Sequence, residues 1–290
     1  MKKKRFEVPE RSGREAPSGP QRPVKPPNGR PTRANSDERR DREPAAGLLF
    51  GVLPVLEALR SNPGRIDKIF VADTAKEHRL AEITALAREH CITLNRLERE
   101  KFSRIAPADV NTQGVIAYAS PVNYADAEEL IEAAGDASLF LILDGIEDPR
   151  NLGAVIRSAE CAGVSGIFIP ERRAVGLTET VAKSSAGAVE YAKVAKVANI
   201  SRLIERLKKK NIWVVGTSSG TAERSYSDWD WKRPSAIVLG SEGSGLHRLV
   251  AENCDMLVKI PMYGKIDSLN VSVAAGVILF EARRQRNTEE

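Results

Sequence analysis

Long hydrophobic runs, cysteine and histidine are all scarce in this chain. It has no run of about eighteen or more apolar residues, so we expect no transmembrane helix and no association with a membrane. The basic N-terminus is not followed by an apolar segment, which argues against a secretory signal. Cys91, Cys161 and Cys254 lie far apart and form no C-x-x-C pair, which favours buried free thiols in a reducing cytoplasm. The three histidines show no metal-ligand spacing, so we expect a cytoplasmic protein without a metal.

The positive charge is concentrated at the N-terminal end. The whole chain has a net charge of +5, yet residues 1–44 alone hold thirteen Lys or Arg and seven Asp or Glu. The same segment holds eight of the sixteen prolines and very few large apolar residues. Such a segment cannot bury enough surface to offset its ordering entropy, so we predict a disordered tail. It is either a solvated tail without function or a polycation that binds RNA phosphates weakly.

Residues 46–120 read as a small α/β domain. Helical spacing over 54–60 stops at the breaker Ser61-Asn-Pro-Gly64. Further periodic patterns predict strands over 66–72, 92–94 and 113–119, and helices over 79–90 and 98–105. No residue of this domain looks catalytic. Its basic side chains either bind RNA or form a solvated surface.

Residues 121–137 form a predicted linker with one helix over 127–134, and residues 138–287 form a second predicted domain. The continuous apolar run Leu139–Asp144 is typical of a parallel strand that is covered on both faces. Further strands are predicted at 166–169, 192–197, 212–216, 236–240 and 256–260, with helices between most of them. This alternation predicts a mostly parallel α/β sheet.

Three strand-to-helix corners in the second domain carry candidate functional side chains. The first follows the strand at 139–144, where Asn151 is placed to cap a helix and Arg157 lies nearly two turns later. An arginine in an otherwise apolar stretch is costly to bury without a partner. We therefore expect Arg157 to form either a structural salt bridge or an anchor for phosphate or ribose.

The other two corners are Leu239-Gly-Ser-Glu-Gly-Ser-Gly-Leu246 and the stretch from Ile260 to Glu281. Glycines let the backbone approach a ligand closely, and turn chemistry alone explains Glu242 poorly. The spacing is not that of the dinucleotide fingerprint, and no P-loop exists. In the last corner, Ser268 and Asn270 stand at the start of a long apolar helix, where they could be simple caps. Such corners are where α/β proteins bind ligands.

Together the three corners resemble the motifs of the SpoU (TrmH) family, the SPOUT-class RNA 2′-O-ribose methyltransferases. The residues that carry the resemblance are Asn151-Leu-Gly-Ala-Val-Ile-Arg157, Leu239 to Leu246, and Ile260-Pro-Met followed by Ser268-Leu-Asn-Val-Ser-Val-Ala-Ala-Gly276. The first domain is similar to the L30e-like substrate-binding domain of the bacterial 23S rRNA guanosine-2′-O-methyltransferase subgroup, through Phe50-Gly51 and Gln113-Gly-Val-Ile-Ala117.

The resemblance implies a deep trefoil knot in the second domain, a homodimer and S-adenosylmethionine as cofactor. It assigns cofactor contacts to Thr217, Gly240, Ile260, Met262, Leu269 and Asn270. It assigns the catalytic roles to Asn151, Arg157, Glu242, Ser268 and Asn270. A guanidinium keeps its proton in proteins, so we expect Arg157 to orient the ribose hydroxyl or to stabilise developing negative charge. The last helix would be the final element of the knot and part of the dimer contact, and its small residues would permit the close packing that a threaded chain requires.

The most direct interpretation is an enzyme that methylates the 2′-oxygen of a ribose in RNA, in a guanosine of 23S rRNA. Transfer RNA is the main rival substrate, because the same motifs serve both. From other classes, a non-catalytic RNA-binding ribosome-assembly factor and a nucleotide-binding oxidoreductase are the alternatives. The presence of all five candidate catalytic residues argues against the first, and the missing fingerprint argues against the second.

Overall fold

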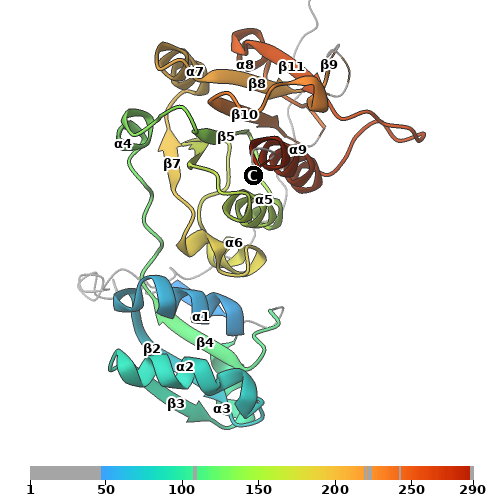
Figure 1. The fold of residues 1–290 in the computed structure, drawn as a ribbon. Helices are drawn as coiled ribbons and strands as arrows, with labels where there is room; N and C mark the ends of the chain where they lie inside the picture. Colours follow the sequence, from blue (N-terminus) through green and yellow to red (C-terminus); the bar gives the residue numbers. More distant parts are fainter. Residues whose placement is uncertain (1–46, 107–109, 219, 221–223, 242, 288–290) are drawn as a thin grey trace, which may run out of the picture. The chain divides into compact units, whose positions relative to one another are not determined.

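Two β-sheets form the framework of the protein, one within residues 47–119 and the other within residues 139–259 (Figure 1). The computed structural model describes residues 47–106, 110–218, 220, 224–241 and 243–287. The predicted tail over residues 1–44 and the candidate Glu242 lie outside these ranges. Among the described helices, none is both long and apolar enough to cross a membrane.

The first sheet has four strands in the order β1-β4-β2-β3. Strand β4 is antiparallel to both β1 and β2, and β2 is parallel to β3. Its strands are β1 (Gly47–Phe50), β2 (Ile66–Ala72), β3 (Thr93–Leu97) and β4 (Val115–Ala119), and its helices are α1 (Val52–Ser61), α2 (Glu77–Glu89) and α3 (Arg99–Ile105). The sequence pattern predicted all of these except β1.

Helices pack differently on the two faces of the first sheet. Helices α1 and α2 pack on one face, where Ile69, Val71 and Ala117 are fully buried. Successive side chains of a strand point to opposite faces, so Phe70 and Tyr118 point the other way. There, Phe102 of α3 packs at one end of the sheet in a separate small core.

The second sheet has seven strands in the order β7-β6-β5-β10-β8-β11-β9, and neighbouring strands are parallel. The prediction of a mostly parallel α/β sheet is therefore confirmed, while the trefoil knot and the domain limits stay predictions. The strands are β5 (Leu139–Asp144), β6 (Gly166–Pro170), β7 (Val194–Val197), β8 (Trp213–Thr217), β9 (Arg224–Ser225), β10 (Ser235–Gly240) and β11 (Met256–Lys259).

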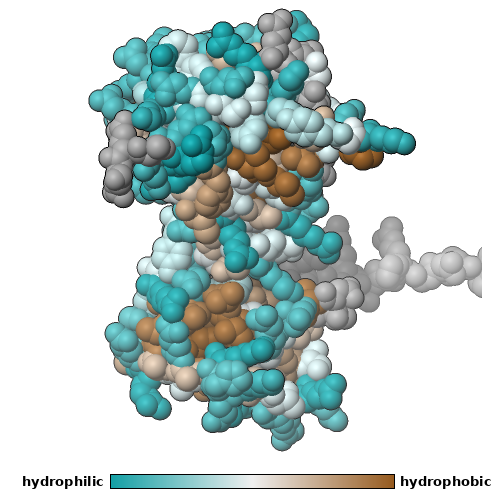
Figure 2. Space-filling model, turned by 45° about the vertical axis from the view of Figure 1, so that its right-hand side comes forward, coloured by the Kyte–Doolittle hydropathy of each residue, from teal (hydrophilic) through white to brown (hydrophobic). Residues whose placement is uncertain are grey.

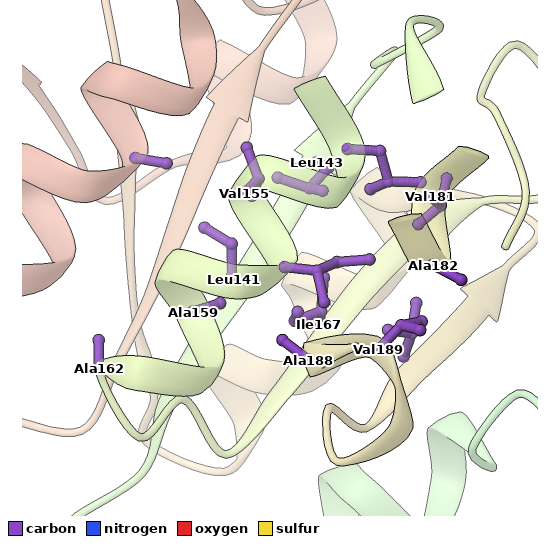
Figure 3. Close-up of a cluster of buried hydrophobic side chains, with 14 of the residues drawn as sticks. Leu141, Leu143, Val155, Ala159, Ala162, Ile167, Val181, Ala182, Ala188 and Val189 are labelled. Atoms are coloured by element: carbon purple, nitrogen blue, oxygen red, sulfur yellow. The ribbon is translucent and has the colours of Figure 1, made fainter. Parts of the chain in front are cut away.

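Helices bury the second sheet on both faces. Side chains of α5 (Pro149–Cys161), α6 (Glu179–Ser184) and α9 (Val271–Arg286) share one core with Leu141 and Leu143, part of which Figure 3 shows. Side chains of α4 (Ala127–Glu132), α7 (Ile200–Lys209) and α8 (Arg248–Asn253) share the opposite core with Phe140 and Ile142. The uninterrupted apolar run of β5 thus supplies both cores by alternation.

The parallel pairing brings several strand ends to one edge of the second sheet. Gly240 at the end of β10 lies opposite Asp144 at the end of β5. On the other side of β10, strand β8 ends at Thr217, which lies opposite Val258 of β11. The loops that leave these strands hold the three corners that the sequence singled out.

Candidate functional site

The glycine-rich turn after β10 is folded tightly back on itself. The backbone N–H of Ser241 donates to the carbonyl of Gly245 at 3.1 Å, and the N–H of Gly245 donates to the carbonyl of Ser241 at 3.0 Å. A Cβ atom at Gly240 would lie 2.1 Å from the carbonyl carbon of Gly245 and 2.4 Å from the nitrogen of Leu246. A side chain at this position would collide with backbone, so the turn requires glycine here.

A buried carboxylate anchors the end of this turn to the neighbouring strand. Asp144, the last residue of β5, is 4% exposed and accepts two hydrogen bonds from His247. One comes from the backbone N–H at 2.8 Å, and the other joins the ring Nδ1 to the second carboxylate oxygen at 2.9 Å. The sequence pattern marked Asp144 only as the end of a strand and indicated no role for His247. Both residues hold the wall of the site.

Helix α5 begins earlier than the sequence suggested. Asp148 caps it by accepting a hydrogen bond from the N–H of Arg150 at 2.8 Å, and Pro149 is its first residue. The prediction that Asn151 caps the helix is wrong: Asn151 lies inside the first turn, where its side chain projects from the helix. The preference of proline for the first helical position was the signal for the earlier start.

Gly153 explains the close approach of α5 and α6. A Cβ atom on Gly153 would lie 1.9 Å from Oγ of Ser184. That hydroxyl donates to the carbonyl of Pro149 at 3.1 Å, so the two helices meet at the first turn of α5. The glycine of the Asn151–Arg157 motif therefore sets the position of Asn151 by packing.

Arg157 is exposed on α5. The helix turns this position toward solvent, whereas Val155 and Ile156 enter the core. Whether Arg157 anchors a phosphate or a ribose stays a prediction. An exposed guanidinium has no desolvation cost to offset. It is instead accessible to a ligand from outside.

Asn270 joins the last corner to the first. Its side-chain oxygen accepts a hydrogen bond from the N–H of Ser272 at 2.9 Å, so it caps α9. Its side-chain nitrogen donates to Oδ1 of Asn151 at 3.0 Å. The two asparagines are 119 positions apart along the chain, yet they are in direct contact.

A cavity of about 710 Å³ lies between the glycine-rich turn, the end of β8 and the loop before α9. The six residues that the resemblance assigned to cofactor contacts all line it, together with Ser268: Thr217, Gly240, Ile260, Met262, Leu269 and Asn270. Neither Asn151 nor Arg157 belongs to its lining. Asn151 meets it through Asn270, and the functional roles of all these residues stay predictions.

The prediction of buried thiols is wrong for Cys91 and Cys161, which are exposed on the surface, whereas Cys254 is half-buried. Burial raises the pKa of Cys254 to about 12, and its Sγ donates to the carbonyl of Val250 at 3.3 Å. A thiol with such a pKa stays protonated near neutral pH and is a poor nucleophile. Within the described ranges, no three His, Cys, Asp or Glu side chains cluster as metal ligands.

Comparisons with known proteins point to one family. Residues 138–280 match the family model described as the SpoU rRNA Methylase family, and residues 48–125 match the one described as RNA 2′-O ribose methyltransferase substrate binding. The chain is 42% identical to the Bacillus subtilis protein named "Putative TrmH family tRNA/rRNA methyltransferase YacO", over 82% of this chain and 96% of that one.

Two further comparisons connect sequence and structure. The chain is 39% identical to the 23S rRNA (guanosine-2′-O-)-methyltransferase RlmB of Pseudomonas syringae, over 83% of this chain and 96% of that one. It also resembles the crystal structure of the AdoMet-bound rRNA methyltransferase from Sinorhizobium meliloti, with a TM-score of 0.66 and 26% identity. That match covers 82% of this chain and 87% of the other.

Proposed function

The chain belongs to the SpoU rRNA methylase family, and on this premise we propose that it methylates a guanosine ribose of 23S rRNA at the 2′-oxygen, in the cytoplasm. The observation that carries the proposal is the contact between Asn151 and Asn270, the second of which lines the cavity. It joins the first and last motifs of the resemblance at one place. The likeness to an enzyme named for a 23S rRNA guanosine supports the choice of substrate.

The cavity suits S-adenosylmethionine, the cofactor of this family. Its volume lies within the range of about 300–1,000 Å³ that small-ligand sites occupy. Leu239, Leu246 and Ile278 provide an apolar wall for an adenine ring, and Thr217 and Ser268 add hydroxyl groups. When bound, S-adenosylmethionine supplies a methyl group on a positively charged sulfur.

The side chains of this chain would then position the ribose. Holding two reacting groups in line can supply several kcal/mol, on the order of 7–11 in favourable cases. Asn151 and Asn270 form a polar pair at the edge of the cavity, where a ribose could exchange hydrogen bonds with them. Arg157 is accessible on α5 and would orient the 2′-hydroxyl or stabilise its negative charge. We assign Ser268 to the shape of the cofactor loop, and Glu242 keeps its predicted role of orienting Arg157.

The direct test combines labelled S-adenosylmethionine with unmodified 23S rRNA or tRNA and then maps the modified nucleotide. We expect a single 2′-O-methylguanosine in 23S rRNA. Methylation of tRNA alone would overturn the assignment of the substrate. Cofactor binding without transfer to either RNA would favour the assembly-factor reading and overturn the proposal.

Arg157→Ala tests the catalytic assignment. We expect the rate of methyl transfer to fall by a factor of about 100 or more, the range seen when one group that stabilises transition-state charge is removed. Cofactor affinity should stay unchanged, because Arg157 does not line the cavity. Arg202→Ala, which changes another exposed arginine on α7, is the control. Full activity of Arg157→Ala would contradict the assignment.

We further propose that the protein forms a homodimer through α9. Val273 and Phe280 are each 50% exposed and lie seven residues apart, on one side of the helix. In Figure 2, brown hydrophobic residues gather at the surface in the upper part of the molecule. Phe280→Glu should therefore yield a monomer in light scattering. Leu249→Glu changes an exposed leucine on α8 and should leave the dimer intact.

A further inference from the structure

An aromatic pair lies on the first sheet, on the face opposite α1 and α2. Phe70 belongs to β2 and Tyr118 to β4, and these are the two central strands of the order β1-β4-β2-β3. The ring centroids are 5.8 Å apart and the rings meet edge to face at 73°. Both side chains are only half-buried, whereas Ile69 and Ala117 beside them on the helix-covered face are fully buried.

A lysine accompanies the pair. Lys68 lies opposite Tyr118 in the strand register, and its Nζ stands 4.8 Å from the centroid of that ring and 5.7 Å from the centroid of Phe70. Lys68 is exposed, as are Thr93 and Asn95 on the adjacent β3. The face therefore offers two rings, one exposed cation and small polar groups.

This combination fits unpaired RNA bases better than a protein surface. Four-stranded sheets that carry aromatic rings on one face stack two or three splayed-out bases on them. An apolar protein partner would bury the ammonium of Lys68 without compensation, which costs free energy. RNA supplies a phosphate next to each base, so the same ammonium gains an anionic partner when a base takes its place on the ring.

We propose that this face binds unpaired nucleobases of the RNA substrate, stacked on Phe70 and Tyr118, with Lys68 on an adjacent phosphate. The inference rests on the proposed function, since it takes RNA as the substrate. It goes further by assigning recognition of single-stranded nucleotides to three side chains that no catalytic motif includes. The first sheet then selects an unpaired region, and the second sheet supplies the chemistry.

Fluorescence anisotropy of the full chain with a labelled single-stranded RNA, and with the same sequence closed into a duplex, tests the proposal. Phe70→Leu and Tyr118→Leu remove the rings but keep apolar bulk. Each should weaken binding of the single strand about tenfold, in line with the stacking contribution of one base. Tyr118→Phe keeps a ring and should bind as the wild type. Lys68→Gln should flatten the salt dependence of binding, whereas Lys76→Gln, an exposed lysine just before α2, is the matched control.

Duplex binding and cofactor affinity should not change in the ring variants, which separates stacking from a loss of fold. Equal losses for single strand and duplex, or no loss for either, would overturn the proposal. Methyl transfer distinguishes it from the proposed function. Ring variants that methylate rRNA with unchanged KM would contradict the stacking face alone, and a wild-type protein that methylates no RNA would contradict the function alone.

Discussion

Helices α1 and α2 bury one face of the first sheet, whereas helices bury both faces of the second. In the first sheet, side chains such as Lys68 and Tyr118 remain accessible along the strands themselves. In the second, the strand interiors are filled by core residues, and the accessible groups lie at the strand ends and in the loops that follow. The number of faces that helices bury thus determines where accessible side chains lie. In the first sheet they lie on the open face, and in the second they lie at the edge where the strands end.

The largest expected difference between the two sheets concerns side chains in mid-strand. Leu141 on β5 is fully buried, so Leu141→Ala should lower the free energy of unfolding by about 2–5 kcal/mol. Asn95→Ala, on the exposed face of the first sheet, should change it by less than about 0.5 kcal/mol. Urea denaturation measures both. Similar losses would show that the first sheet is packed on both faces after all.

The turns of the two regions should also respond differently. In Gly240→Ala the added carbon meets backbone at 2.1 Å, which the site cannot relieve without moving the cavity wall. Overpacking of this kind costs about 1–3 kcal/mol, so affinity for S-adenosylmethionine should fall about tenfold or more. At Gly64 the nearest atom would be 3.7 Å away, and Gly64→Ala should bind normally in isothermal titration calorimetry. Normal binding by Gly240→Ala would show that this turn is not part of the cofactor site.

The two regions likewise offer a buried and an exposed aspartate. Asp144→Asn removes the negative charge that faces the backbone N–H and the ring Nδ1 of His247, so a part-buried, charge-assisted contact is weakened by about 1–3 kcal/mol. We expect weaker cofactor binding and a lower melting temperature. His247→Ala keeps the backbone bond and should have the smaller effect. Asp67→Asn, exposed on β2, should change neither quantity, and an equal effect at both aspartates would contradict the anchoring role.

At neutral pH the smallest difference should come from two thiols, because their effect appears only in alkali. Burial raises the pKa of Cys254 from 9.0 to about 12, so the folded state holds its proton over a pH range in which the unfolded chain releases it. Stability therefore falls as pH rises from about 9 to 12, by at most about 1.4 kcal/mol per pH unit. Cys254→Ala should flatten this slope in pH-dependent denaturation, and Cys91→Ala, at an exposed position, should not. Equal slopes for wild type and Cys254→Ala would refute the assignment.

The regular parts of the fold could be predicted from local pattern. The unbroken apolar run of β5 and the alternation of strands with helices were sufficient for a parallel sheet buried on both faces. Strand β1 was missed because it has four residues, and its stabilisation comes from pairing with β4, far along the chain. Local periodicity carries no information about such a partner.

The sequence motifs identified which residues belong to the candidate site, but not which of them are in contact. The motifs named Asn151 and Asn270, yet only the structure brings the two side chains into contact. The cap at Asp148 was overlooked because Asn151 is an equally good capping type, and only the proline between them marks the true start. The solvent-facing side of α5 was available from periodicity, because Leu152, Val155, Ile156 and Ala159 form its apolar face and leave Arg157 on the other side. The anchoring of His247 by Asp144 joins residues 103 positions apart, beyond any local signal.

The bond between Asp144 and His247 also has a consequence for the time course of folding. The pairings of the first sheet all lie within residues 47–119, whereas the cavity requires contacts such as this one, between residues 103 positions apart. Non-local contacts are slow to form, because the chain loses the entropy of a long loop before the contact contributes any stabilising free energy. Cofactor binding should therefore be the last property to return on refolding, and the rate of its return measures the slowest step.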